Sequence, residues 1–332
     1  LVSSRIGVSL GYAAQGFGYA TVVTALPAFK QRYGIDDGAV TLVILTVCAL
    51  AAAGSVLTER IALRRGSAFA LLAGLTAQSL AFALIATAAL VDAVALPAFW
   101  LAFGLYGLGL GMVGAAAGIQ GVLVEQQRGS TVMAGFFACT TAAAMVGALG
   151  MAALQGAGSP GRAGLAVLVA AVVAATVVMV ARPRLVPVDL PLAVVGMEAG
   201  HLEPGAPLDT AAQKAPLPRW GIIAVGSVVL AAFVVDSAVS SWSTVLLSDE
   251  LVAGATIAPL GYAAYQAVVL VTRLVGDRLT DALGRAVPVL AASVLAAVGL
   301  VVVALVAAPV AAIIGFAVAG LGVGVLVPAA FS

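Results

Sequence analysis

Apolar residues run along this chain in long uninterrupted stretches that short polar joints separate. A helix that crosses the hydrocarbon core of a bilayer needs about 20 predominantly apolar residues. Ten segments meet that requirement, so the sequence predicts ten transmembrane helices. They are expected near residues 5–28, 39–60, 67–90, 96–121, 130–155, 162–182, 220–246, 256–278, 286–308 and 309–331.

The ninth and tenth segments are nearly continuous, and their boundary is predicted at Pro309. Proline fits the first turn of a helix, where no N–H is needed, and breaks a helix interior. We therefore expect one helix to end just before Pro309 and the next to begin there.

Residues 183–219 differ from the rest, because they hold seven of the 14 prolines and several charges. Such a composition cannot bury enough apolar surface to form a core. We interpret this stretch as a linker between a six-helix bundle at 1–182 and a four-helix bundle at 220–332.

Composition supports a membrane protein, since 63% of residues are hydrophobic, 9% are charged and the mean hydropathy is +1.18. Soluble chains average about 45–50% apolar and about 25% charged residues. The net charge of +1 gives no reason to expect nucleic-acid binding. Cys48 and Cys139 both lie inside apolar runs, and no metal-ligand or cofactor-binding spacing is present. The expected fold class is therefore all-α, with no cofactor and no metal.

The basic residues predict an orientation, because Lys and Arg favour the cytoplasmic side of a membrane. With the N-terminus inside, twelve of the 15 Lys and Arg residues lie on the cytoplasmic side. Lys30, Arg32 and Arg162 lie outside.

Two features of the first half recur in the second. The polar joint 276–285 has a weaker copy at Gly54, Leu57 and Glu59, and the glycine run 107–111 matches 320–324. Paired halves in a membrane protein indicate a secondary transporter. The glycines fit close helix packing or a mobile wall of the transport path.

At these joints the chain resembles the major facilitator superfamily, whose cytoplasmic motif has the form G-x-L-x-D-x-x-G-R. The resemblance implies two helical bundles, twelve helices of which ten are present here, and a cytoplasmic gating motif that latches the outward-open state. The residues expected to form that motif are Gly54, Leu57, Glu59, Arg273, Gly276, Asp277, Leu279, Asp281, Gly284 and Arg285. The segment from Asp236 to Ser243 is similar to a fucose-permease-like bacterial branch, which implies a bacterial inner membrane.

Asp236 is the strongest candidate for chemistry, because an ionisable group inside a membrane span is costly and usually functional. Ser240 and Ser243 follow at i+4 and i+7, so the three form a polar stripe on one face. A proton carrier, a solute ligand and a structural hydrogen bond all fit this stripe.

Tyrosine and glutamine side chains form further stripes. They suit a cavity for a hydroxylated or amphipathic solute, but they also suit ordinary hydrogen bonding between helices. These residues are Tyr12, Gln15, Tyr19, Gln120, Tyr262, Tyr265 and Gln266. Glu125 is expected to form an ion pair with Arg128 near the turn between the fourth and fifth helices. Arg273 is expected to pair with Asp277, because the two are four residues apart on one helix.

The function predicted from these features is transport of a small solute by alternating access, coupled to protons through Asp236, by a monomer. A sensor or scaffold with a transporter-like fold is the alternative. A membrane-embedded enzyme is disfavoured, because no catalytic motif of the H-E-x-x-H or G-x-S-x-G type occurs.

Overall fold

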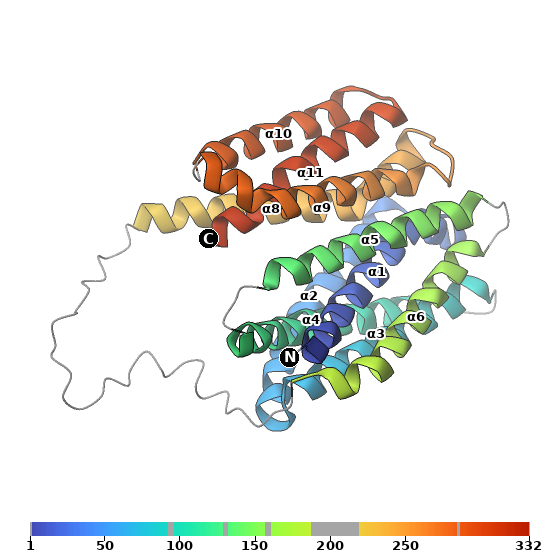
Figure 1. Cartoon of the computed structure of the whole chain (residues 1–332). Coiled ribbons are helices and arrows are strands. Elements are labelled where there is room, and N and C mark those ends of the chain that lie inside the picture. Colours follow the sequence, from blue (N-terminus) through green and yellow to red (C-terminus); the bar gives the residue numbers. More distant parts are fainter. Residues whose placement is uncertain are drawn as a thin grey trace.

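The computed structural model describes residues 2–91, 96–128, 132–156, 161–186, 219–283 and 286–331. Within these ranges the chain forms helices and no strand (Figure 1). The ten α-helices among the described residues are α1 (Val2–Tyr33), α2 (Asp37–Arg65), α3 (Ser67–Leu90), α4 (Leu96–Arg128), α5 (Met133–Gly156), α6 (Arg162–Ala181), α8 (Arg219–Val245), α9 (Ala258–Leu283), α10 (Ala286–Leu305) and α11 (Pro309–Phe331). Each overlaps one of the ten predicted segments, and α1, α2 and α4 extend beyond theirs, so the all-α prediction is confirmed.

Two short turns extend the regular helices. A 3₁₀ turn, η1 (Arg182–Arg184), follows α6, and a π-helical turn, η2 (Leu246–Glu250), continues α8. Among the described residues, eight helices are long and apolar enough to cross a membrane. The other two are α1, which polar residues interrupt, and α11, whose described apolar stretch is the shorter Pro309–Gly324.

The boundary predicted at Pro309 is confirmed. Helix α10 ends at Leu305 and α11 starts at Pro309, as expected for a residue that lacks an N–H and prefers the first helical turn. The first turn of α11 is closed by a 3.0 Å bond from Ala312 N–H to the Ala308 carbonyl.

Successive helices alternate in direction, so the molecule has two ends (Figure 1). We call them the Arg65 end, where α1 begins and α2 and α11 finish, and the Lys30 end, where α1 finishes and α2 begins. The helices form two groups, α1–α6 and α8–α11. Helix α5 packs on α9 and α1 packs on α8, and these contacts join the groups.

Glycines bring the helices of the first group together. A side chain at Gly107 or Gly111 of α4 would collide with the backbone of α2 at Val47 or Ala51. The glycine between them, Gly109, faces the other way and contacts α3.

The second group repeats this arrangement. Gly320 and Gly324 of α11 lie against α9, at Tyr265 and Thr272, whereas Gly322 between them lies against α10. In both groups, the fourth helix therefore packs on the second through its outer glycines and on the third through its middle glycine. The matching glycine runs of the sequence thus correspond to matching helix contacts in space.

Candidate functional site

A polar cluster lies where the two groups meet, and its single carboxylate among the described residues is Asp236 of α8. Asp236 is half-buried, and its Oδ1 accepts a 2.6 Å hydrogen bond from the Tyr265 hydroxyl of α9. Arg273, further along α9, is within electrostatic reach of the same carboxylate. An ionised Asp236 therefore has both a hydrogen-bond donor and a counter-charge, which a charge in a membrane span requires.

Arg273 also crosses from the second group to the first. Its guanidinium donates to Thr141 Oγ1 at 2.5 Å and to the Phe137 carbonyl at 3.3 Å, both on α5. It also lies 5.9 Å from the centre of the Phe137 ring. The side chain of Asp277, its expected partner, lies outside the described residues. Arg273 thus connects the α5–α9 contact to Asp236.

Side-chain hydroxyls from both helix groups lie beside Asp236. Gln266 donates a 2.5 Å hydrogen bond to the Tyr262 hydroxyl, and the buried Ser240 lies close to that hydroxyl. The Tyr19 hydroxyl of α1 lies next to Ser240 and Ser241 of α8. The structure therefore brings together six predicted residues, namely Tyr19, Asp236, Ser240, Tyr262, Tyr265 and Gln266.

Tyr106 of α4 joins the cluster, although the sequence analysis missed it. It is 2% exposed, and its hydroxyl has no hydrogen-bond partner among the described residues. The Tyr106 hydroxyl interacts electrostatically with the hydroxyls of Tyr19, from the first helix group, and Tyr262, from the second. Its ring packs on Phe82 at 5.5 Å and on Phe103 at 6.3 Å between centroids. Its place beside the glycine run of α4 was the one available signal.

Gln120 bonds to none of the cluster residues, so its place in a cavity stays a prediction. It is fully buried within the first group, where its Nε2 donates to Ser67 Oγ at 2.8 Å and to the Val186 carbonyl at 3.2 Å. Its Oε1 accepts from the Val186 N–H at 2.9 Å. Gln120 of α4 thus links Val186, which follows α6, to Ser67 of α3.

Tyr12 and Gln15 also make their contacts inside the first group. Tyr12 is buried and stacks on Phe136 of α5 at 5.6 Å between centroids. Gln15 donates a 3.2 Å hydrogen bond to the Leu110 carbonyl of α4. Of the α1 stripe, Tyr19 is the member that contacts α8.

The first copy of the gating motif is described, and the second is described only in part. Gly54 lies against the Leu108 carbonyl of α4, Leu57 is half-buried, and Glu59 is exposed without an ion pair to any described residue. In the second copy, the side chains of Gly276, Asp277, Leu279 and Asp281 lie outside the description. Gly284 and Arg285 lie outside the described ranges altogether, so the latch stays a prediction.

The expected Glu125–Arg128 pair is wrong. Glu125 Oε1 instead accepts hydrogen bonds from the N–H groups of Val132 and Met133, at 2.6 and 2.9 Å. These groups belong to the start of α5, where free N–H donors and the helix dipole favour a carboxylate.

At the Lys30 end an ion triad joins the two groups. Lys30 of α1 donates to Asp37 Oδ1 of α2 at 2.6 Å and to Asp249 Oδ2 of η2. These are the ion pairs found among the described residues. Lys30 lies beyond the predicted span 5–28, and the hydrogen bonds to Asp249 and then Asp37 raise its pKa. It is therefore a cation at any physiological pH.

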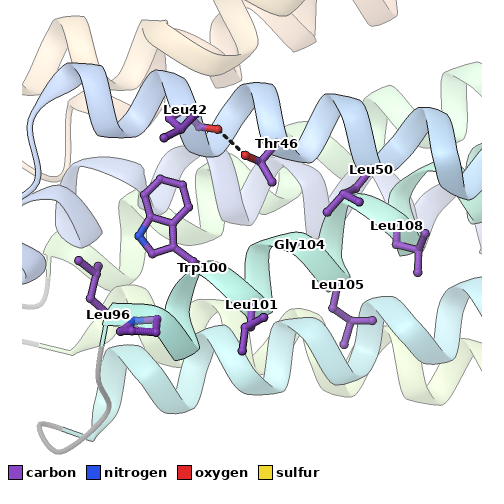
Figure 2. A pocket seen from close by; sticks show the side chains of 10 residues that line it. Leu42, Thr46, Leu50, Leu96, Trp100, Leu101, Gly104, Leu105 and Leu108 are labelled. Atoms are coloured by element: carbon purple, nitrogen blue, oxygen red, sulfur yellow. Dashed lines mark hydrogen bonds between the residues drawn. The ribbon is translucent and has the colours of Figure 1, made fainter.

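A groove of about 940 Å³ lies between α2 and α4, and no residue of this cluster lines it (Figure 2). Leucine side chains and Trp100 line it, and the hydroxyl of its one threonine, Thr46, bonds to the Leu42 carbonyl at 2.8 Å. Leu101 on its wall is 76% exposed. Such a mainly apolar surface suits lipid chains.

Known proteins resemble this chain along its length. A family model described as "Major Facilitator Superfamily" matches residues 8–332. An uncharacterised MFS-type transporter of Yersinia pestis is 27% identical over an alignment of 344 positions, which covers 100% of this chain and 80% of the relative.

Solved structures share the fold at low sequence identity. The crystal structure of a D-xylose–proton symporter has a TM-score of 0.68 and 13% identity, and the alignment covers 97% of this chain and 80% of the symporter. The crystal structure of the nucleoside transporter NupG has a TM-score of 0.66 and 10% identity, and the alignment covers 98% of this chain and 80% of NupG.

Proposed function

Since the chain belongs to the major facilitator superfamily, we propose that it moves a small solute across a membrane by alternating access, coupled to protons through Asp236. The chain is an integral membrane protein and a transporter, not an enzyme. Two helix groups that touch along α1–α8 and α5–α9 support rocking about the cluster between them. The similarity to a proton symporter for D-xylose and to a nucleoside transporter supports a small solute.

The observation that carries proton coupling is the set of contacts around Asp236. Its carboxylate accepts a 2.6 Å hydrogen bond from the Tyr265 hydroxyl and interacts electrostatically with Arg273. The guanidinium of Arg273 also donates a hydrogen bond to Thr141 of α5. Protonation removes the negative charge that attracts Arg273, so more of the guanidinium is available to Thr141 and Phe137. The protonation state of Asp236 therefore biases the α5–α9 contact between the groups.

The remaining parts of the proposal concern placement. We place the Arg65 end in the cytoplasm, because most basic residues lie there, in a bacterial inner membrane. The gating motif around Glu59 and Asp281 latches that end when it closes, and the working unit is a monomer.

Solute uptake into proteoliposomes with an imposed pH gradient tests the coupling. Asp236→Asn should abolish gradient-driven accumulation and retain exchange of solute between the two sides, because exchange needs no net proton movement. Glu250→Gln is the matched control, since Glu250 is an exposed acid in η2, the continuation of the same helix.

Full gradient-driven uptake by Asp236→Asn would disprove the role of Asp236. If the unaltered protein moved no member of a broad solute panel in either assay, the alternative of a sensor or scaffold would replace transport.

A further inference from the structure

We infer that the cluster binds an uncharged, polyhydroxylated solute, and that Tyr106 is one of the residues that select it. The inference rests on the proposed transport function and adds the chemical class of what is carried. It depends on three observations: unpaired buried hydroxyls, balanced charge, and donors that face the cluster from both groups.

Buried hydroxyl groups normally have hydrogen-bond partners, and each exception needs an explanation. The Tyr106 hydroxyl is buried, and no described residue bonds to it. The Ser240 hydroxyl lies close to Tyr19 and Tyr262 but meets hydrogen-bond geometry with no described group. The hydroxyls of Tyr106 on α4 and Ser240 on α8 are therefore available to bond to the hydroxyls of a solute.

The charges of the cluster are already balanced. Asp236 and Arg273 are the described charged side chains within its electrostatic reach, and they have opposite signs. Asp236 is engaged by Tyr265, and Arg273 is engaged by Thr141 and the Phe137 carbonyl. A charged solute would add an uncompensated charge inside the membrane span, which is costly. A neutral solute adds none.

Both helix groups supply hydroxyls to the cluster. Tyr19 and Tyr106 belong to the first group, and Ser240 and Tyr262 belong to the second. A solute with hydroxyls on several of its faces bonds to both groups at once. Each of these four hydroxyls can both donate and accept a hydrogen bond. They can therefore bind such a solute whichever of its hydroxyls donate and whichever accept.

Tyr106→Phe separates a binding role from a structural one. Because the hydroxyl that it removes is unpaired, the variant should keep or slightly raise the melting temperature of the solute-free protein. Its affinity for a bound neutral solute should fall about five- to tenfold, the loss of one hydrogen bond. Tyr33→Phe is the matched control. It removes a hydroxyl that bonds to the Ala88 carbonyl at 2.8 Å, so it should lower the melting temperature and leave affinity unchanged.

The probes are a hexose, a pentose and a nucleoside, together with the uronate and the 2-amino analogue of the hexose. Calorimetric titration of the detergent-purified full chain should find a neutral probe that binds at least tenfold more tightly than its charged analogues. The inference is overturned if no neutral probe binds, if a charged analogue binds as tightly, or if Tyr106→Phe leaves the affinity unchanged. Flux of the same probes in proteoliposomes distinguishes the two failures: movement of a charged probe alone refutes this inference and leaves transport standing.

Discussion

Polar side chains inside apolar runs look alike in the sequence of this chain, but they have different roles in the structure. Gln120 and Asp236 are two such side chains. Gln120 ties a backbone segment in place, whereas Asp236 lies at the contact between helix groups. The difference depends on Val186, which lies 66 positions from Gln120, and helical spacing gives no information about such a distant partner.

The structural role of Gln120 predicts a loss of stability without a loss of binding. Gln120→Leu leaves the buried Val186 N–H without its acceptor, which should cost about 1–3 kcal/mol of unfolding free energy. Thermal denaturation followed by tryptophan fluorescence measures the effect. Gln126→Leu, an exposed site on the same helix, should be near neutral. Equal melting temperatures for the two variants would contradict the role.

The residues of the α8 and α9 stripes lie together as their spacing suggested, and their role stays a prediction, whereas Tyr106 was not predicted. Asp236 and Ser240 stood out because they are polar within an apolar span. Tyr106 lies among Phe99, Phe103 and glycines, so it is indistinguishable from a core aromatic until the hydroxyl is seen without a partner. The contacts of Arg273 with α5 were not predicted, because contacts across helices leave no periodicity in the sequence.

At the scale of elements, the glycines of α4 set how closely α2 approaches. Gly111→Ala would drive a methyl group into the Ala51 carbonyl of α2, and overpacking of this kind costs about 1–3 kcal/mol. Gly118→Ala on the same helix meets nothing within 4 Å and should stabilise α4 by about 1 kcal/mol through helix propensity. The melting temperatures of the two variants should therefore move in opposite directions. A neutral Gly111→Ala would mean that α2 and α4 separate easily at this point.

Whole-molecule architecture was the most predictable level, because ten apolar runs and two repeated motifs are long-range patterns that a single residue cannot disturb. The helix ends followed from local chemistry, as at Pro309. Contacts between the groups were not predictable. Lys30 is separated from Asp249 by 219 positions, and no pattern in the sequence links residues so far apart.

The Lys30 triad holds the two groups together at one end, so its removal should favour opening there. Lys30 and Asp249 are 18% and 24% exposed, and a partly exposed ion pair contributes about 1 kcal/mol at most. Lys30→Ala should therefore shift the ratio of open to closed molecules at this end by about fivefold. Spin labels on Gln31→Cys and Val252→Cys, one in each group, report the change as longer distances.

A charge exchange tests whether the pair itself is responsible. Lys30→Asp alone places a third acid beside Asp37 and Asp249 and should open the Lys30 end further. Combined with Asp249→Lys, it restores a cation between two carboxylates, now with the lysine on η2. The double variant should recover the short distances, because the charges at the contact are the same and only their helices have changed. If the double variant stays open, the triad does not control closure, and the packing of α1 on α8 alone sets the equilibrium between the two states.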